Sequence, residues 1–314
     1  MATIPLRDGH KLYVRFYGKG AQPVMLLHGQ GMDSRFWLPF IWRWRNQCRF
    51  IMPDFRGAGR SSSIPLNQLD VIQNHMEDVQ DVSTHLALNQ IKLVGYSLGG
   101  TVSLHWQRAG GFANVSHYLH IDQSPCTSNK PDWTYGLFGD RQEELYANMR
   151  QLEALLESHS NWKSITELPY QHRKQAIDIL GKLFSLMAGK PILHPLLRAA
   201  SHWPTLLQQV LPLTNITFIQ ANLACYLDLA QDYRDSLIDC PTPVTVMTGM
   251  KSPLYHPKGQ AEIAKLVQEA SIIRFEKSGH APMFDEPLKF TRELGRFLVG
   301  DIERDLMPDT KWAR

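Results

Sequence analysis

The sequence predicts an α/β fold in which a mostly parallel, twisted sheet is flanked by helices. Short apolar or β-branched runs alternate with amphipathic stretches over the first third of the chain, which is typical of a sheet covered on both faces. The same alternation returns in the C-terminal quarter. With 314 residues, of which 43% are hydrophobic, the chain can bury one substantial core.

Individual elements follow from the spacing of apolar residues, which is two in half-buried strands and about 3.6 in helices. Seven short runs predict strands, at residues 12–17, 24–27, 50–52, 91–94, 116–121, 243–248 and 271–275. Helical spacing predicts helices at residues 71–88, 143–157, 171–187, 205–211, 260–268 and 287–298.

The pattern changes between residues 127 and 235, where strand-like runs vanish and Leu-rich helical segments take over. We therefore predict an α/β core of residues 1–126 and 236–299, a helical lid of residues 127–235 and a loosely held tail of residues 300–314. Several apolar side chains of the lid could line an acyl pocket or form the core of the lid itself: Trp133, Tyr135, Leu137, Phe138, Leu183, Phe184, Leu186 and Met187.

Composition excludes several classes of partner. The 33 basic and 30 acidic residues give a formal charge of +3 with no long run of one sign, so no nucleic-acid partner is predicted. Residues 1–14 do not resemble a signal peptide, and no uncharged apolar run approaches the roughly 20 residues that cross a bilayer. We expect a cytoplasmic protein that acts on a small, uncharged or apolar molecule with an acyl group, and its oligomeric state stays open.

The four cysteines lack the spacing of a zinc site and are too few for a disulfide framework. We interpret them as buried free thiols and predict neither a metal nor a cofactor. They are Cys48, Cys126, Cys225 and Cys240.

The strongest local signal is a Gly-x-Ser-x-Gly motif centred on Ser97. It follows an apolar strand-like run and opens a helical stretch, so Ser97 would lie on a sharp strand-to-helix turn. Gly95 and Gly99 remove side chains that would collide at such a turn. This context predicts that Ser97 is a nucleophile at the carboxyl edge of the sheet.

Two backbone amides are candidates for an oxyanion hole. An apolar run leads directly into His28-Gly29-Gln30-Gly31, whose small residues allow a tight turn beside the nucleophile. The amide of Gln30 can then point at a substrate oxyanion together with the amide of Leu98. We interpret His28 itself as a structural histidine bonded to the loop.

A third motif supplies the general base. His280 lies in Gly279-His280-Ala281-Pro282, between the last predicted strand and the closing helix. A histidine on this loop, with glycine before it for close approach, is placed to reach a serine at the sheet edge. We therefore predict that His280 accepts the proton of Ser97.

The order of these motifs resembles that of the α/β-hydrolase superfamily, in its serine esterase-like branch. The motifs are His-Gly-x-Gly, the loop from Asp54 to Ser61, the serine motif and Gly-His-x-Pro. The resemblance covers nearly the whole chain outside the lid and tail. It implies the α/β-hydrolase fold and the chain order serine, acid, histidine. It also implies a structural, buttressing role for Asp54 and Arg56.

The acid of the triad departs from the usual pattern of this superfamily. The common acid position, after the strand that follows the lid, is occupied here by Ser252, and a hydroxyl cannot stabilise an imidazolium as a carboxylate does. Asp122 lies one helix and one strand after Ser97, at the same sheet edge, where some haloalkane dehalogenases and short-acyl esterases keep their acid. We predict Asp122 as the acid, with three alternatives at the lid exit: Asp228, Asp232 and Asp235.

These residues predict a serine hydrolase that cleaves a carboxylic ester or thioester through an acyl-enzyme. The same triad is compatible with a perhydrolase of the haloperoxidase type, a lactonase or an acyltransferase. A binding protein on the same scaffold is a further alternative, although such a protein would be expected to lose Ser97, His280 or the glycines.

Overall fold

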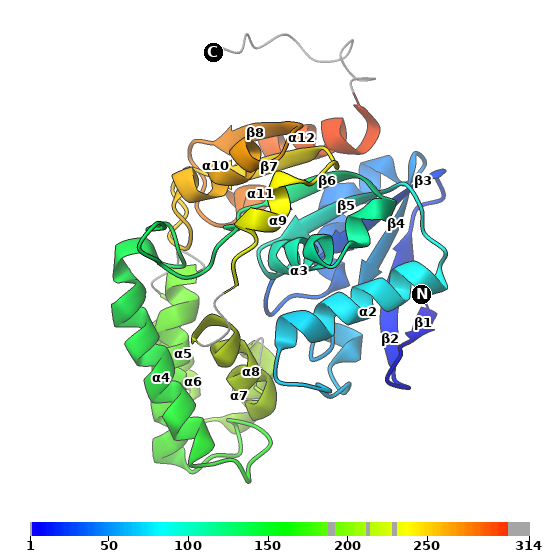
Figure 1. Ribbon diagram of the computed structural model, residues 1–314. Helices are drawn as coiled ribbons and strands as arrows, with labels where there is room; N and C mark the ends of the chain where they lie inside the picture. The colour runs from blue at the N-terminus through cyan, green and yellow to red at the C-terminus, as the bar shows by residue number, and fades with distance from the viewer. Residues whose placement is uncertain (1, 188–191, 212–213, 228–230, 301–314) are drawn as a thin grey trace.

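An eight-stranded sheet organises the chain in the computed structural model, which describes residues 2–187, 192–211, 214–227 and 231–300 (Figure 1). The strand order is β1-β2-β4-β3-β5-β6-β7-β8; β1 and β2 pair in antiparallel fashion, and β3 to β8 are mutually parallel. The predicted α/β fold class is therefore confirmed. The strands are β1 Ala2–Pro5, β2 Lys11–Tyr17, β3 Gln22–Leu27, β4 Cys48–Pro53, β5 Ile91–Tyr96, β6 Val115–Ile121, β7 Val244–Gly249 and β8 Ala270–Phe275.

Helices connect the strands and cover the sheet (Figure 1). Those that belong to the α/β part are α1 Leu38–Ile41, α2 Val71–His85, α3 Leu98–Arg108, α10 Pro257–Leu266, α11 Pro282–Asp285 and α12 Pro287–Val299. Those between β6 and β7 are α4 Gln142–Glu157, α5 Tyr170–Met187, α6 Leu193–Ala200, α7 Pro204–Val210, α8 Ile216–Leu227 and α9 Arg234–Ile238.

The sheet has a separate apolar core on each face. Helices α2, α3 and α10 contribute Val79, Val102 and Ile263 to one core, and each of these side chains is fully buried. Helices α1 and α12 contribute Ile41 and Leu294 to the other. Because both faces are covered, the central parallel strands are buried over most of their length on both faces, as is general in parallel sheets.

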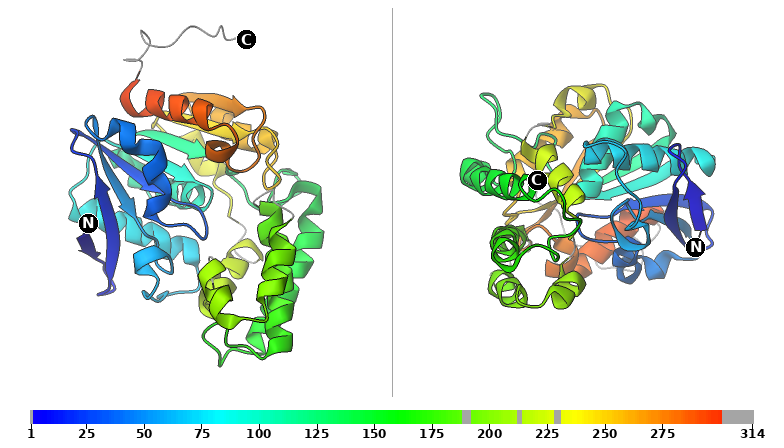
Figure 2. Two further views of the ribbon diagram at one scale, coloured as in Figure 1. Left: turned by 180° about the vertical axis from the view of Figure 1, so that it is seen from behind. Right: turned by 90° about the horizontal axis from the view of Figure 1, so that it is seen from below.

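The helices α4 to α8 pack mainly against one another and project beyond the sheet (Figure 2). Their core includes Leu152, Ile177 and Leu207, all fully buried. Leu137, Phe138 and Leu183 join this core, so these side chains help to hold the helices together. The side chain of Met187 and most of the predicted tail, residues 301–314, lie outside the described residues.

A close contact joins this helical block to the α/β core. Gly57, in the loop after β4, has φ of +79°, and a Cβ there would lie 2.4 Å from the ring of Phe218 on α8. A glycine at this position therefore satisfies both a left-handed backbone and the space that the aromatic ring needs. Among the described residues, no helix combines the length and the apolar character that a membrane span requires.

Candidate active site

The backbone at Ser97 is held in an uncommon conformation between β5 and α3. Its φ and ψ are 51° and −117°, a strained combination for a residue other than glycine. The turn is closed on both sides: a Cβ at Gly95 would lie 2.6 Å from the carbonyl oxygen of Gly99, and one at Gly99 would lie 2.3 Å from that of Leu27. Any side chain at Gly95 or Gly99 would therefore clash with the backbone, so the turn requires both glycines.

His280 lies next to Ser97, although 183 residues separate them in sequence. Its Nε2 is 3.0 Å from Ser97 Oγ, and its Nδ1 is 2.5 Å from Asp122 Oδ2. The loop after β8 holds the histidine in place, because the amide of Gly279 donates to Asp285. The ring also packs against Tyr96, with centroids 5.3 Å apart.

Asp122 directly follows β6 and is completely buried. Its φ is +44°, a region in which aspartate and asparagine are tolerated better than most residues. Besides His280, the carboxylate accepts hydrogen bonds from the amide of Gly249 at 3.2 Å, from Ser252 Oγ at 2.8 Å and from Gln260 Nε2 at 2.6 Å. Two donors therefore face each carboxylate oxygen and fix the orientation of the carboxylate beside His280.

Gln260, on α10, is fully buried, and sequence reasoning missed it. Its Nε2 donates both to Asp122 and to the carbonyl of Tyr255, whereas its Oε1 has no hydrogen-bond partner within the described part of the chain. The amide is therefore oriented by two acceptors. No local motif points to Gln260. Ser252 was identified from the sequence as the residue at the usual acid position, but its hydrogen bond to Asp122 was not predicted.

The three alternative acids lie in other environments or outside the described residues. Asp232 pairs with Lys130 at 2.6 Å and with Arg234 at 2.8 Å, and these cations hold the pKa of its carboxyl well below the usual range despite partial burial. Asp235 is exposed near the start of α9. Asp228 lies outside the described residues. Among the four predicted candidates, Asp122 is the one with a described hydrogen bond to His280.

The loop that carries Gln30 is fixed by His28. Nδ1 of His28 donates to the carbonyl of Gly29 at 2.9 Å, and Nε2 accepts from the amide of Phe55 at 3.1 Å. Both ring nitrogens are used, as expected for a structural histidine, and burial lowers the pKa of this imidazole. Leu98 is the first residue of α3, where backbone amides have no acceptor within the helix.

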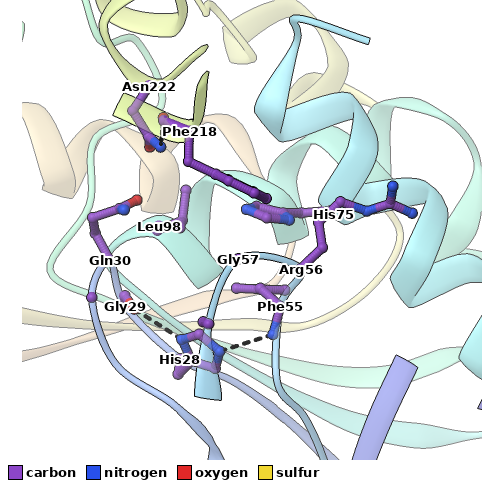
Figure 3. Close-up of a pocket in the computed structure, with 12 residues that line it drawn as sticks. His28, Gly29, Gln30, Phe55, Arg56, Gly57, His75, Leu98, Phe218 and Asn222 are labelled. Atoms are coloured by element: carbon purple, nitrogen blue, oxygen red, sulfur yellow. Dashed lines mark hydrogen bonds between the residues drawn. The ribbon is translucent and has the colours of Figure 1, made fainter. Parts of the chain in front are cut away.

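Gln30 and Leu98 border a recess between these loops and α8 (Figure 3). Phe218 reaches down from α8 toward Gly57 and His75, and Asn222 lies one helical turn further along. Among the described residues, no group of three or more His, Cys, Asp or Glu side chains is arranged to hold a metal ion. Cys48, Cys126, Cys225 and Cys240 are buried and free.

The fold and this arrangement define a hydrolase-type scaffold, and comparison with known proteins gives the family. The model of the alpha/beta hydrolase family matches residues 24–294. The chain therefore belongs to the α/β-hydrolase family of enzymes, and the family resemblance predicted from the sequence motifs is confirmed.

Relatives extend over nearly the full chain at low identity. A protein of Bacillus subtilis named AB hydrolase superfamily protein YisY is 22% identical, over 91% of this chain and 94% of its own. A pimeloyl-[acyl-carrier protein] methyl ester esterase of Pectobacterium atrosepticum is also 22% identical, over 91% and 98%. Among solved structures, an esterase from Exiguobacterium antarcticum shares the fold with a TM-score of 0.68 and 23% identity, over 95% of this chain and 98% of that one.

Proposed function

We propose that this enzyme hydrolyses carboxylic esters through an acyl-enzyme on Ser97, with His280 as general base and Asp122 as the acid that orients it. The observation that carries the proposal is the unbroken pair of hydrogen bonds from Ser97 Oγ to His280 Nε2 and from His280 Nδ1 to Asp122 Oδ2. Relatives named as methyl ester esterases support an ester as the substrate class. A thioester is open to the same chemistry.

In the first half-reaction, Ser97 Oγ attacks the ester carbonyl and its proton passes to His280 Nε2. The carbonyl oxygen becomes an oxyanion, which the amides of Gln30 and Leu98 stabilise. The tetrahedral intermediate collapses when the C–O bond to the alcohol breaks, and the imidazolium returns the proton to the departing oxygen. Throughout, the buried carboxylate of Asp122 stabilises the positive charge on His280.

In the second half-reaction, water takes the place of the alcohol. His280 removes a proton from the water, which attacks the acyl carbonyl, and the second tetrahedral intermediate releases the acid as the bond to Ser97 Oγ breaks. The proton then returns from His280 to Ser97. The helical block at residues 127–235 acts as a lid over this site, with Phe218 and Asn222 facing the substrate recess.

Labelling with a fluorophosphonate probe tests the nucleophile, and a pH-stat assay with methyl and p-nitrophenyl esters of increasing acyl length tests the reaction. We expect wild-type protein to be labelled and to release acid, and Ser97→Ala to lose both while staying folded. Turnover of Ser97→Ala above a few per cent of wild type, or no cleavage of any ester by untreated wild type that the probe is able to label, would contradict the proposal.

A further inference from the structure

A buried glutamine, Gln123, directly follows the proposed acid and reaches the helix that begins at the nucleophile. Its side chain is 1% exposed. Its Nε2 donates to Thr101 Oγ1 at 2.7 Å and to the carbonyl of Ser97 at 3.4 Å, and its Oε1 accepts from the amide of Ser124 at 2.8 Å. Both ends of the side-chain amide are therefore engaged, and one end is fixed to α3.

The turn at the nucleophile is held by α3 and β6 without help from Gln123. The carbonyl of Ser97 accepts from the amide of Gly100 at 2.7 Å and from that of Thr101 at 3.1 Å, which are the first bonds of the helix. The amide of Ser97 donates to the carbonyl of Ile121 at 3.0 Å. Since these bonds already fix the turn, the bond to Thr101 constrains Gln123 rather than Ser97.

Asp122 needs such a constraint because its backbone conformation is unfavourable. Its φ is +44°, and strained residues persist only where the surrounding structure holds them. On the N-terminal side β6 ends at Ile121, and the amide of Asp122 donates to the carbonyl of Met247 on β7 at 2.9 Å. On the C-terminal side the strand has ended, and the side chain of Gln123 fixes the chain to α3.

His120 holds the main chain of the same turn. Its ring is completely buried, with Nδ1 2.7 Å from Tyr118 Oη and Nε2 2.9 Å from the carbonyl oxygen of Gln123. Burial lowers the pKa of His120 to about 4, so the imidazole is neutral near pH 7. Because a carbonyl only accepts, Nε2 carries the proton and Nδ1 accepts from the tyrosine hydroxyl. The bond from His120 to Gln123 therefore closes a turn around Asp122.

We propose that Gln123 is a positioning residue of the triad: it ties the chain after Asp122 to α3 and thereby holds the carboxylate in place beside His280. One imidazole must contact both Asp122 and Ser97, over distances of 2.5 Å and 3.0 Å. Catalytic groups need to be held within about 0.5 Å of the productive geometry, and supporting hydrogen bonds provide that precision. The inference rests on the proposed ester hydrolysis and names a residue that serves it.

Gln123→Met tests the inference, because methionine has a similar volume and forms none of the side-chain hydrogen bonds of Gln123. Asp122 stabilises an imidazolium that exists only during the reaction, so a displaced carboxylate should lower kcat rather than raise KM. On one p-nitrophenyl ester we expect kcat to fall by about tenfold, with KM within about twofold of the wild-type value. A kcat within twofold of wild type in folded Gln123→Met would overturn the inference.

A double-mutant cycle with Asp122→Asn shows whether Gln123 acts through the acid. If it does, the position of residue 122 matters little once the carboxylate is gone. Gln123→Met should then change the residual kcat of Asp122→Asn by less than about twofold. A purely structural role predicts the same loss in both backgrounds, and that result would count against the inference.

Thr101 offers a second route that leaves the glutamine in place. Thr101→Val removes the acceptor of the 2.7 Å bond and should reproduce the loss of kcat. Thr101→Ser keeps the hydroxyl and should stay near the wild type. If Gln123→Met fails to fold, the comparison of these two variants decides, and equal kcat values in both would refute the role of Gln123.

Gln142→Met is the matched control for the loss of a buried glutamine. Gln142, 3% exposed at the start of α4, also uses both ends of its side-chain amide: it accepts from the amide of Asn129 and donates to the carbonyls of Thr127 and Leu137. Its loss should lower the urea midpoint about as much as Gln123→Met does, yet leave kcat within about twofold of wild type. An equal loss of kcat in both variants would show that Gln123 acts through stability alone.

Failure of this inference is distinguishable from failure of the proposed function. If Asp122→Asn loses activity while Gln123→Met does not, only the role of Gln123 is wrong. If wild-type protein cleaves no ester and the fluorophosphonate probe does not label Ser97, the proposed function is wrong, and the inference falls with it.

Discussion

The hydroxyl of Ser252 donates to Asp122 Oδ2 at 2.8 Å, the same oxygen that lies 2.5 Å from His280 Nδ1. Ser252 occupies the position where most α/β-hydrolases carry their acid. In this chain the carboxylate beside the imidazole belongs to Asp122 at the end of β6, and Ser252 hydrogen-bonds to it. The two positions therefore converge on one point beside the imidazole, from neighbouring strands β6 and β7.

Loss of a donor to Asp122 should reduce turnover without preventing folding. Gln260→Met fills the same volume but cannot donate to the carboxylate, and Ser252→Ala removes the donor on the other oxygen. Because a hydrogen bond to a charged group contributes about 1.5–3 kcal/mol, we expect kcat to fall by about tenfold or more in each variant with little change in KM.

A pH profile separates this positioning role from a general structural one. With fewer donors the carboxylate of Asp122 is held less firmly beside His280 and stabilises its imidazolium less, so the acid limb of the kcat/KM profile should move to lower pH. Unfolding midpoints in urea provide the control for stability. An unchanged acid limb with kcat within twofold of wild type would show that these donors do not act through Asp122.

A residue of the site could be predicted from the sequence where its neighbours in the chain mark it, and not where only distant packing brings it into place. Ser97 was predictable because the elbow glycines adjoin it, and Asp122 because the carboxyl ends of parallel strands share one sheet edge. Gln260 was not, since its contact with Asp122 spans 138 residues and is set by the packing of α10 against β7. His75 is one more residue of α2 in the sequence, and only the fold places it in the lining of the recess that Gln30 also borders.

The fold shows the same division. The six parallel strands were predictable from their apolar runs, five of which are mostly buried, whereas β1 was missed because Ala2–Pro5 has only one buried residue, Ile4. It is a strand because it pairs with β2, which local sequence does not encode. The predicted boundaries of the lid at residues 127 and 235 stay predictions, and α9 crosses the second of them.

Acid should destabilise the protein through histidines that are buried in the neutral form. Burial lowers the pKa of His75 to about 3 and that of His120 to about 4, against about 6.5 in the unfolded chain. Below about pH 6.5 the unfolded state binds more protons, so stability is present above that pH and is lost as the pH falls toward the folded values. At pH 5 the loss is about 2 kcal/mol for each histidine.

Urea unfolding of wild type and His75→Phe between pH 7 and pH 5 measures this effect. The free energy of unfolding of the wild type should decrease as the pH falls. The free energy of unfolding of the variant should decrease by a smaller amount, and the difference is the contribution of one histidine. Changes in other groups cancel in the difference. Parallel curves for the two proteins would mean that His75 is already protonated, or freely hydrated, in the folded state.

Gly57 should be energetically coupled to Phe218. Gly57→Ala places a Cβ against the ring of Phe218 and also forces a side chain onto a residue with φ of +79°. Strain of this kind costs about 1–3 kcal/mol before the clash is counted. Combination with Phe218→Ala removes the clash but not the backbone strain, so Gly57→Ala should cost less in that background. Coupling below about 0.5 kcal/mol in urea unfolding would argue against the contact.

The acid of the triad is tested most directly by Asp122→Asn. Asparagine tolerates the positive φ at this position, so the backbone should not move. Gln260 Nε2 and the amide of Gly249 both donate to Oδ1, and they require the amide oxygen of the new residue on that side. The NH2 group must then face His280 Nδ1, which becomes an acceptor, and the proton moves to Nε2. The imidazole can no longer accept the proton of Ser97, so kcat should fall by about 10⁴ with the fold retained.

Ser252→Asp in the Asp122→Asn background should then restore part of the rate. In the wild type, Ser252 Oγ and His280 Nδ1 both contact Asp122 Oδ2, so a carboxylate at residue 252 would lie close to His280 Nδ1. It can accept hydrogen bonds from the imidazole and from the side-chain amide of the new asparagine. In the wild-type background the same Ser252→Asp change should lower the rate, because two carboxylates would compete for one site. We expect a gain of at least about tenfold in the double variant over Asp122→Asn, measured as kcat on one p-nitrophenyl ester. Wild-type activity in Asp122→Asn alone would rule out Asp122 as the acid, whatever the double variant does.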